Sequence, residues 1–591
     1  MDSAMHDAAR VIEEAAHAAK AGDVARAIAL VREALAARPG DADLLRTYAR
    51  VSVLGGEGAG AARALRAIAD AHVADAGVQR DAAEALVLAG APDEALEVLA
   101  RAAPADAGAA ECRAKALLAL GRVDEFRGAA AGIPEAAPDQ PAAWWRGAKV
   151  LAQVGLAHEA AALLRRGLAR LPDDPDLLEV LCYVMNFDPA TDPVEHAALH
   201  RRLGEVTTAL GPSVIAPFAN ARDPGRVLRV GFVSGDLRFH ACAFFLAGLI
   251  AGLDRVRVQP VLYANHAPDE TTHNFAALAP LRVVHALGDD DLEDVVRADL
   301  IDVLVDCNGW TGAHRLRALA RRLAPVQVTY LGYPNTTGLA AMDARIVDAI
   351  SDPPGAEAHA SERLVRLAGC FVAFTPASET PDPAATGYAT GDAGASAGPT
   401  FVCFNRVAKM HEALLALWAR LVGEIPGARL CLKAEPEPGI EHVVRRAWAR
   451  GGGAPGSLVL LPFEPDPRRH LAAYNQGDVA LDTFPYNGTT STFEALLMGV
   501  PVVTLCGGTH RARVGASILT HAGLGEFVAH SEAEYVALAG RVARDRAMLR
   551  DLRGTLRGRL IGGPLCDARS HAAEFERALR GLWTAWCGGR R

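Results

Sequence analysis

The 591-residue sequence lacks the usual features of a secreted or membrane-inserted protein. Its ten cysteines include no CxxC pair and do not have the Cys/His spacing of a zinc finger, so we expect reduced, mostly buried thiols rather than disulfides. The N-terminal stretch is acidic where a signal peptide needs a basic and then an apolar segment, and no uncharged apolar run is long enough to span a bilayer. These absences predict a cytoplasmic protein without membrane insertion.

The sequence also lacks a basic field and is poor in aromatic residues. Lysine and arginine number 61 against 70 acidic residues, for a formal charge of -9, and aromatic residues make up 6%. Nucleic-acid binding needs a basic surface or a set of stacking aromatics, so we expect no nucleic-acid partner. What the chain does have is 51% hydrophobic residues. In a chain of this length that is enough for about three domains with substantial cores.

The first third of the chain, residues 1–185, is predicted to be a helical repeat domain. Good helix formers dominate it, and helix-ending glycines recur in steps of 34, 34, 31 and 34 residues, at Gly22, Gly56, Gly90, Gly121 and Gly155. That period is typical of tetratricopeptide repeats. Five positions after each glycine stands a small or apolar residue, where paired helices must approach closely: Ala27, Ala61, Ala95, Phe126 and Ala160. We predict a solenoid whose concave surface takes an extended peptide or a partner protein. The alternative is an irregular alanine-rich helical domain without such a surface.

Beyond a transition segment, residues 186–225, short β-branched strands alternate with helices. Near-continuous apolar runs such as VLRVGFVS, VQPVLYA and IDVLVDC are typical of buried parallel strands, so residues 226–375 are predicted to form a Rossmann-like domain. Residues 376–400 are poor in large apolar side chains and are predicted to be a linker. Runs such as TFVCFN, ARLCLKA and VPVVTL predict a second Rossmann-like domain in residues 401–591, whose last helix packs back across the pair. A nucleotide-bearing substrate in the cleft is the expectation for this architecture.

The stretch LDTFPYNGTTSTFEALLMGVP, residues 481–501, has the pattern of a phosphate-binding turn. It predicts a short strand, a turn rich in hydroxyls, and a helix that Gly499 and Pro501 bring to an end. A helix entered through such a turn offers free N–H groups to an anion, and Glu494 one turn later could accept hydrogen bonds from a ribose. The alternative is an ordinary capping box, in which a hydroxyl and a glutamate three residues later cap the helix.

Two further residues lie where parallel α/β domains place their sites. His240 follows the first predicted strand, in the loop at its carboxyl end, and could act as an acid, a base or an orienting donor. Lys409 lies at the strand-to-helix turn that opens the second domain, where it could neutralise a diphosphate leaving group. The ordinary alternatives are a helix-start histidine without a task and a solvated lysine.

Five motifs in the two α/β domains follow one another in a characteristic order. They are LRVGFVSGDLRFH, APVQVTYLGYPNTTGLAAMDARIVD, ISDPP, FNRVAK and DTFPYNGTTSTFEALLMGVPVVTLCGGTHRARVGAS, within residues 227–540. Together they resemble the O-linked N-acetylglucosamine transferase and SPINDLY family, particularly SPINDLY and its bacterial relatives. The resemblance implies an α plus α/β fold, with a tetratricopeptide (TPR) solenoid followed by a GT-B pair of Rossmann-like domains. It also implies inverting transfer of a sugar from a nucleotide sugar to Ser or Thr of a protein.

The resemblance assigns roles to individual residues. Lys409 is similar to the lysine that contacts the donor diphosphate, His240 to the histidine once proposed as general base, and His470 to the histidine that stacks on the nucleotide base. Thr490 and Ser491 match the hydroxyl pair at the phosphates, and Glu494 stands where an aspartate holds the ribose. The rest of the predicted donor-binding set is Asn405, Asn487, Gly488 and Thr489. No acidic pair with metal-like spacing lies near these motifs, and cores of this type need no metal, so we expect catalysis without metal or cofactor.

One departure leaves the donor open. Thr489 stands where the N-acetylglucosamine transferases carry a histidine, which gives the all-hydroxyl run typical of the SPINDLY branch. GDP-fucose and UDP-N-acetylglucosamine are both candidates, as is another nucleotide sugar. The predicted function is a protein O-glycosyltransferase whose repeats present the acceptor, such as flagellin or another abundant protein, with a homodimer left open. The alternatives are a glycosyltransferase acting on a small molecule or a lipid-linked glycan, and an inactive TPR scaffold.

Overall fold

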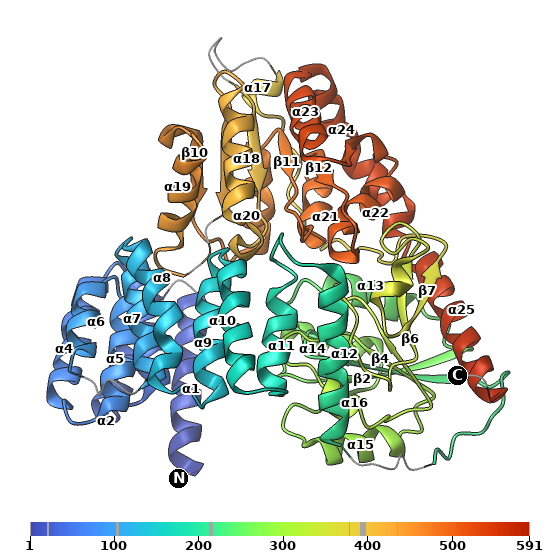
Figure 1. The fold of residues 1–591 in the computed structure, drawn as a ribbon, viewed down its shortest axis with the longest axis horizontal. Coiled ribbons are helices and arrows are strands. Elements are labelled where there is room, and N and C mark those ends of the chain that lie inside the picture. Colours follow the sequence, from blue (N-terminus) through green and yellow to red (C-terminus); the bar gives the residue numbers. More distant parts are fainter. Residues whose placement is uncertain are drawn as a thin grey trace. The chain divides into compact units, whose positions relative to one another are not determined.

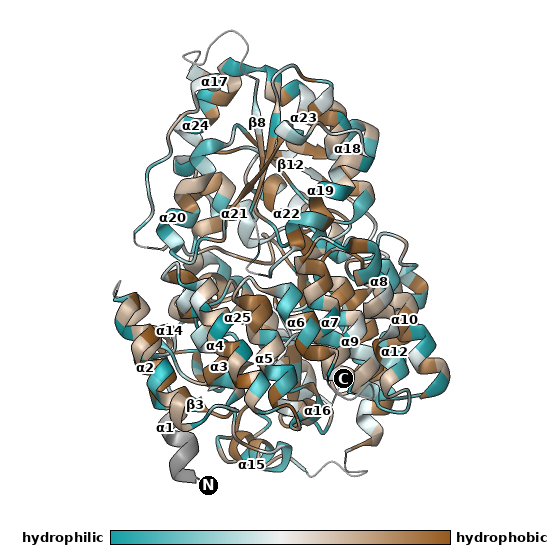
Figure 2. Ribbon diagram, turned by 90° about the vertical axis from the view of Figure 1, so that its left-hand side faces the viewer, coloured by the Kyte–Doolittle hydropathy of each residue, from teal (hydrophilic) through white to brown (hydrophobic). Residues whose placement is uncertain are grey.

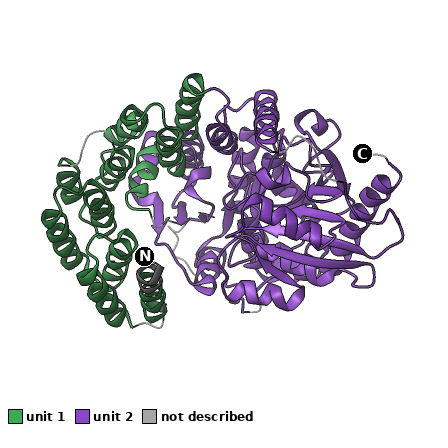
Figure 3. Cartoon of the chain, turned by 90° about the horizontal axis from the view of Figure 1, so that it is seen from below, with its two compact units in different colours: residues 1–171, 434–447 green, residues 172–433, 448–591 purple. Residues whose placement is uncertain are grey.

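The computed structural model describes residues 2–20, 23–101, 106–211, 217–377, 379–390, 398–433, 435 and 437–589. The chain divides into two compact units (Figure 3). Unit 1 comprises Met1–Leu171 and Ala434–Ala447, and unit 2 comprises Pro172–Lys433 and Trp448–Arg591. Within the described parts of the chain, no helix has the length and apolarity needed to cross a membrane.

Unit 1 is a row of antiparallel helix pairs (Figure 1). Its helices are α1 (Asp2–Lys20), α2 (Val24–Ala37), α3 (Ala42–Leu54), α4 (Gly58–Ala71), α5 (Ala76–Leu88), α6 (Pro92–Leu99), α7 (Ala107–Ala119), α8 (Val123–Gly132), α9 (Pro141–Gln153) and α10 (Ala157–Arg170). Gly56, Gly90, Gly121 and Gly155 adopt positive φ between paired helices, from 71° to 84°, which only glycine reaches without strain. Gly22 lies outside the described residues.

The close-contact positions of the repeats are buried as predicted. Ala27, Ala61, Ala95, Phe126 and Ala160 are each at most 1% exposed, because the two helices of a pair meet there. The predicted repeat domain extends to residue 185, but its last helix, α11 (Pro175–Val184), belongs to unit 2. Unit 1 also takes up residues 434–447, which come from the second α/β half of the sequence.

The first sheet of unit 2 has seven parallel strands in the order β3-β2-β1-β4-β5-β6-β7. The strands are β1 (Leu228–Ser234), β2 (Val258–Ala264), β3 (Leu281–Val283), β4 (Val303–Asp306), β5 (Val326–Thr329), β6 (Ala344–Asp348) and β7 (Arg363–Leu367). The associated helices are α12 (Pro193–Ala209), which lies in the predicted transition segment, α13 (Ala243–Gly252), α14 (Glu270–Leu278), α15 (Asp289–Ala298) and α16 (Leu316–Leu319). The strand order reverses between β1 and β4, and such a reversal is where ligands bind in open α/β sheets.

The second sheet has six parallel strands in the order β10-β9-β8-β11-β12-β13, which is the Rossmann order. Figure 2 shows its brown, hydrophobic strands, with β8 and β12 labelled, between helices on both sides. They are β8 (Thr400–Cys403), β9 (Arg429–Lys433), β10 (Leu458–Leu461), β11 (Val479–Leu481), β12 (Val502–Leu505) and β13 (Val528–Ala529). The helices are α17 (Gly387–Thr390), α18 (Glu412–Gly423), α19 (Ile440–Arg450), α20 (Pro467–Ala472), α21 (Thr490–Leu497), α22 (Val514–His521), α23 (Glu532–Arg544) and α24 (Arg546–Ile561).

The last helix, α25 (Ala568–Cys587), returns to the first sheet. The ring of Phe575 stacks 6.3 Å from that of Phe232 on β1, and the indole of Trp583 donates a hydrogen bond of 2.9 Å to the carbonyl of Asp223. The prediction that the final helix packs back is therefore confirmed for the first α/β domain. The C-terminal helix therefore belongs to the core of the first α/β domain, although it follows the second domain in the sequence.

Candidate active site

Asp482 stabilises the turn between β11 and α21 through hydrogen bonds to both of its carboxylate oxygens. One carboxylate oxygen of Asp482 accepts the backbone N–H of Gly488 at 2.7 Å, and the other accepts the hydroxyl of Thr504 at 2.7 Å. Burial raises the pKa of Asp482 to about 6. A Cβ atom at Gly488 would lie 2.2 Å from the hydroxyl oxygen of Ser491 and would displace that hydroxyl. The turn therefore has one well-defined conformation.

The N-terminus of α21 is open to an anion. Thr489 occupies the N-cap position, but its side chain makes no capping hydrogen bond. Among the described residues, the backbone N–H groups of Thr489, Thr490 and Ser491 have no acceptor. The capping-box alternative is therefore wrong, and these N–H groups are available to phosphate oxygens.

Lys409 lies beside this turn. Its ammonium donates to the backbone carbonyl of Asn487 at 2.8 Å and sits 4.0 Å from the centre of the Tyr486 ring. Burial lowers the pKa of Lys409 to about 8, against the opposing attraction of Asp482. The group thus remains a cation at neutral pH. Because it has lost much of its hydration, it interacts strongly with any anion placed next to it.

Asn405 and Asn487 frame the turn in different ways. The side-chain oxygen of Asn405 accepts the hydroxyl of Ser491 at 2.8 Å, so Asn405 orients that hydroxyl. The side chain of Asn487 is fully buried, donates to the carbonyl of Thr483 at 2.8 Å and accepts the N–H of Gly515 at 3.2 Å. Asn487 therefore supports the turn, and its carbonyl holds Lys409.

A second cluster joins three elements of the same domain. The imidazole of His470, on α20, lies 3.1 Å from a carboxylate oxygen of Glu494 on α21 and 2.7 Å from the ammonium of Lys433 at the end of β9. A Lys433 that donates to Nδ1 leaves the Nε2–H of His470 to donate to Glu494. The hydroxyl of Tyr474 also donates to Glu494 at 3.2 Å. These contacts fix the orientation of both predicted nucleotide-binding side chains.

His240 lies in the loop between β1 and α13, where its side chain is 40% exposed. Its Nδ1 is 3.5 Å from a carboxylate oxygen of Asp236 and 3.3 Å from the backbone nitrogen of Cys242. Desolvation lowers the pKa of His240 below its ordinary value, against the attraction of Asp236 and with smaller contributions from Arg238 and Arg406. Two neutral tautomers fit. An Nδ1–H directed at Asp236 leaves Nε2 as a free base, whereas an Nε2–H leaves Nδ1 to accept from Cys242.

Aromatic packing brings the two α/β domains of unit 2 together near these groups. Phe493, on α21, lies 5.6 Å from Phe245 on α13 and 4.9 Å from Phe374, measured between ring centres. His510 and Asp352 form a further bridge, with Nδ1 2.5 Å from the carboxylate oxygen. The loop that carries His240 is therefore held close to the helix that carries the phosphate turn.

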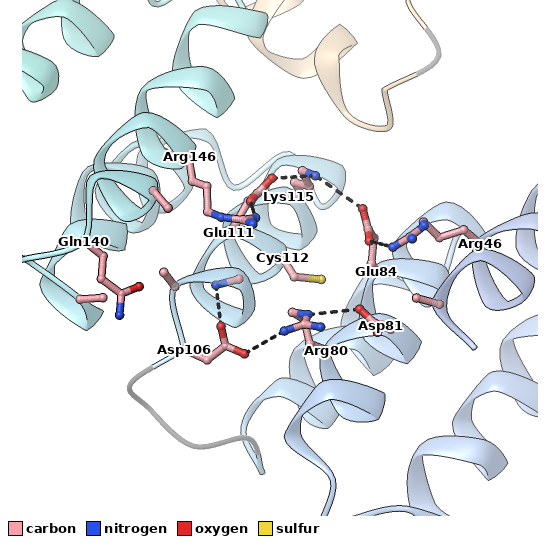
Figure 4. Close-up of a pocket in the computed structure, with 15 residues that line it drawn as sticks. Arg46, Arg80, Asp81, Glu84, Asp106, Glu111, Cys112, Lys115, Gln140 and Arg146 are labelled. Carbon is pink, nitrogen blue, oxygen red and sulfur yellow. Dashed lines mark hydrogen bonds and ion pairs between the residues drawn. The ribbon is translucent and has the colours of Figure 1, made fainter. Parts of the chain in front are cut away.

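Unit 1 contains a separate polar groove of about 670 Å³ (Figure 4). Side chains from α3, α5, α7 and α9 face it and are already paired with one another. Arg146 lies 2.6 Å from Glu111, Lys115 3.0 Å from Glu111, and Arg80 3.3 Å from Asp106. The groove is therefore lined by ion pairs, and such a lining suits a partner with polar and charged side chains.

Comparison with known proteins identifies the family. The model of Glycosyl transferase family 41 matches residues 196–374 and 396–575, more than half of the chain. The chain belongs to glycosyltransferase family 41. A tetratricopeptide repeat model matches residues 18–80 of the same chain. The predicted family and the predicted fold class, a TPR solenoid followed by two Rossmann-like domains, are thereby confirmed.

Individual relatives agree with this assignment. A probable UDP-N-acetylglucosamine–peptide N-acetylglucosaminyltransferase SPINDLY from Arabidopsis thaliana is 36% identical over 66% of this chain and 43% of its own length. A second probable UDP-N-acetylglucosamine–peptide N-acetylglucosaminyltransferase of the same plant, SEC, is 27% identical over 62% of this chain and 38% of its own length. The structure of a Thermobaculum terrenum O-GlcNAc transferase, a lysine-to-methionine mutant, matches 99% of each chain with 30% identity and a TM-score of 0.74. This family-41 chain spans less than half the length of either plant relative.

The structure of this family-41 chain brings most of the predicted site residues into two groups. The first joins Asn405, Lys409, Asn487, Gly488 and Ser491 by direct contacts. The second joins His470 to Glu494. Within the described part of the chain, neither group is joined to His240 by a hydrogen bond or an ion pair. The side chains of Thr489 and Thr490 are half-buried at the mouth of the turn. The roles of all the predicted site residues, in both groups and outside them, stay predictions.

Sequence reasoning missed four residues that shape the family-41 site. Asp482 and Lys433 each stand at the carboxyl end of a parallel strand, and that position is a usable signal. Asp236 lies four residues before His240, a spacing that could have suggested a pair. Tyr474 carries no such signal, because its contact with Glu494 depends on how α20 and α21 are placed.

Proposed function

We propose that the chain is an inverting protein O-glycosyltransferase that moves a monosaccharide from a nucleotide sugar to Ser or Thr of an acceptor protein. The observation that carries this proposal is the convergence of the Lys409 ammonium with the free N–H groups of α21. A desolvated cation and a helix N-terminus together favour a diphosphate, and more so when it becomes a leaving group with extra negative charge. The names of the relatives support the same class of reaction.

In the proposed reaction, the acceptor hydroxyl attacks the anomeric carbon from the face opposite the diphosphate. The bond from the anomeric carbon to the diphosphate oxygen breaks, and a new bond to the acceptor oxygen forms with inverted configuration. The nucleoside diphosphate leaves with its charge stabilised by Lys409, the hydroxyl of Ser491 and the N–H groups of α21. His240, in the tautomer with Nδ1–H directed at Asp236, accepts the hydroxyl proton on Nε2.

The donor is proposed to be UDP-N-acetylglucosamine or GDP-fucose, with another nucleotide sugar as the alternative. His470 is proposed to stack on the base and Glu494 to hold the ribose; their mutual hydrogen bond supports this because it fixes both side chains at one rim of the turn. Titration of the purified protein with UDP, GDP and CMP identifies the nucleotide, and Glu494→Ala serves as the ribose control. Tightest binding of CMP would contradict both named donors.

We further propose that catalysis requires no metal ion. The positive charge that a metal supplies in other transferases is provided here by Lys409 and the N-terminus of α21. Transfer should therefore proceed at an unchanged rate after exhaustive chelation with EDTA. Activity that disappears with EDTA and returns only with Mg²⁺ or Mn²⁺ would contradict this.

The acceptor is proposed to bind in the charged groove of unit 1 (Figure 4). TPR units bind partner proteins in this way, and flagellin or another abundant cytoplasmic protein is the proposed acceptor, with a homodimer as the proposed assembly. Intact-mass analysis of total protein from cells with and without the chain tests the proposal, because a mass increment identifies sugar and acceptor together. An increment on a small molecule or glycan would favour that second substrate class, and no increment together with no nucleotide binding would favour an inactive scaffold.

A further inference from the structure

Three metal-ligand side chains gather in the loop that leads from β1 into α13. The Nδ1 of His240, a carboxylate oxygen of Asp236 and the Sγ of Cys242 all lie within 4.8 Å of one another. The nitrogen and the oxygen are 3.5 Å apart. Two ligands of a tetrahedral zinc ion are separated by roughly 3.3 Å, since each bond is about 2.0–2.1 Å long. The nitrogen and the oxygen are therefore close to the required spacing, and the Sγ of Cys242 lies within 4.8 Å of both.

The ligand atoms of this cluster are available. The second oxygen of Asp236 accepts the side-chain N–H of Asn308 at 3.0 Å, which orients the carboxylate. Its first oxygen lies 3.5 Å from the Nδ1 of His240 and 4.0 Å from the guanidinium of Arg238. The Nδ1 of His240 has two long contacts, one of 3.3 Å with the backbone nitrogen of Cys242 and one of 3.5 Å with the carboxylate of Asp236. Asn308 would thus hold a metal ligand without touching the metal, and such outer partners are a regular feature of metal sites.

A second cluster of the same composition provides the contrast. Asp348, Cys370 and His521 also bring their ligand atoms within 4.8 Å. However, both oxygens of Asp348 are occupied: one accepts the N–H groups of Ile350 and Ser351, and the other accepts the N–H of Phe371 and the hydroxyl of Ser517. A metal would have to displace several buried hydrogen bonds there. At the Asp236 cluster, a metal would replace only the long contacts of His240 and the hydrogen bond between the Cys242 thiol and the Asp236 carboxylate.

We propose that Asp236, His240 and Cys242 form an inhibitory site for a thiophilic divalent cation, with Zn²⁺ as the best-matched ion. Zinc accepts nitrogen, sulfur and carboxylate ligands in one tetrahedral site, whereas Mg²⁺ and Ca²⁺ prefer oxygen alone. On binding, the Cys242 thiol loses its proton to solvent and a bond forms between sulfur and zinc. A water molecule completes the tetrahedron.

Occupation of this site would disable His240 as a base. A metal on Nδ1 fixes the tautomer that carries its proton on Nε2, so Nε2 has no lone pair with which to accept the proton of the acceptor hydroxyl. The inhibitory half of the inference rests on the proposed function, but the binding half does not. Metal binding can therefore be measured whether or not transfer is observed.

The binding test uses Co²⁺ as a spectroscopic probe and Zn²⁺ in equilibrium dialysis against the full-length protein. We expect about one ion per chain and a near-ultraviolet sulfur-to-cobalt absorption band, because a thiolate is among the ligands. Cys242→Ser should remove the band and weaken Zn²⁺ binding by about tenfold or more. Asp236→Asn should weaken binding while the band persists, and circular dichroism verifies that each variant is folded.

Cys566→Ser is the matched control, because Cys566 is another partly buried thiol of the same unit and lies far along the chain in a different element. It should bind both ions as the wild type does. Wild-type binding by Cys242→Ser, or loss of the band only in Cys566→Ser, would overturn the proposed site.

The activity test compares each protein with and without Zn²⁺. Wild type and Cys566→Ser should lose transfer in Zn²⁺ and regain it on chelation. At the lowest Zn²⁺ concentration that inhibits the wild type, Cys242→Ser should keep most of its activity. Metal binding without inhibition would overturn the inhibitory role and leave the site, and absence of transfer from all proteins would contradict the proposed function but not the site.

Discussion

Lys409 combines two properties that normally oppose each other, a low-polarity environment and a positive charge. Burial lowers its pKa to about 8, yet Asp482 and the carbonyl of Asn487 keep the ammonium charged at neutral pH. Tyr486 shields one side of the charge from water. A cation held in this way needs little reorganisation when negative charge develops nearby, and such preorganisation is the main source of electrostatic catalysis.

Replacement of Lys409 by alanine should reduce transfer by about 10²- to 10³-fold, the usual cost of removing one charge-stabilising donor. The fold should persist, because the side chain makes its hydrogen bond to a single carbonyl group. Steady-state kinetics on the nucleotide sugar measure the effect, with circular dichroism as the check on folding. Near-wild-type turnover would show that Lys409 has no part in the reaction.

The pH dependence of transfer should report the same group. As pH rises through about 8, Lys409 in the free enzyme loses its proton, so kcat/KM for the donor should fall. At low pH, protonation of His240, whose pKa lies below its ordinary value, should remove the base. Any residual activity of Lys409→Arg should lack the alkaline decline, because a guanidinium does not titrate in this range. An identical alkaline limb in both proteins would assign the decline to another group.

At the scale of the element, the turn from β11 into α21 works because its backbone is fixed before any ligand arrives. The carboxylate of Asp482 accepts a hydrogen bond from the N–H of Gly488. The hydroxyl of Thr492 donates one to the carbonyl of Gly488 at 3.0 Å. The next N–H groups are left without protein acceptors among the described residues. A site built from backbone groups depends on close approach of the chain, and glycine permits that approach.

Gly488→Ala tests this dependence. The added Cβ would lie 2.2 Å from the Ser491 hydroxyl oxygen and 2.9 Å from the side-chain oxygen of Asn405, so these two polar side chains must leave their positions beside the turn. Affinity for the nucleoside diphosphate, measured by calorimetry, should fall by about tenfold or more, the equivalent of about 1.4 kcal/mol.

Gly554→Ala is the matched control for that substitution. Gly554 lies within α24, and among the described residues no heavy atom outside its own helical backbone would lie within 4 Å of a Cβ added there. Alanine at this position should leave nucleotide affinity unchanged and raise the free energy of unfolding by about 0.5–1 kcal/mol. Equal loss of affinity in both variants would show that the turn is not the binding element.

The same element shows what sequence alone could predict. The strand Val479–Leu481, the hydroxyl-rich turn and the helix end at Gly499, with φ of 70°, follow from local residue preferences. By contrast, β5, β6 and β7 were not identified as strands, because buried polar residues such as Gln327 and Arg345 interrupt their apolar pattern. The pairing of His470 with Lys433 joins residues 37 apart and depends on strand order, which local patterns do not encode.

At the scale of the whole molecule, the sequence predicts separable domains, but the compact units do not follow the order of the chain. Residues 434–447 cluster with the repeats: a Cβ at Gly439 would lie 2.2 Å from the carbonyl oxygen of Leu118, and Arg446 pairs with Asp124 at 2.6 Å. Deletion of the repeats would expose this contact surface. Substitutions within the groove therefore test acceptor binding more cleanly than truncation.

The double variant Arg80→Ala, Arg146→Ala removes two of the groove's cations and leaves Asp106 and Glu111 with fewer partners. Transfer to a full-length acceptor protein should fall by about tenfold, since each partly exposed charge contributes up to about 1 kcal/mol. Hydrolysis of the donor should be unchanged, because it needs only the site in unit 2. The exposed arginines Arg32 and Arg63, on α2 and α4, do not line the groove, and their double alanine variant is the charge-matched control. If both double variants modify the acceptor equally well, the groove is not where the acceptor binds. If donor hydrolysis falls together with transfer, the groove substitutions also affect the catalytic site in unit 2, and the two functions are not separable.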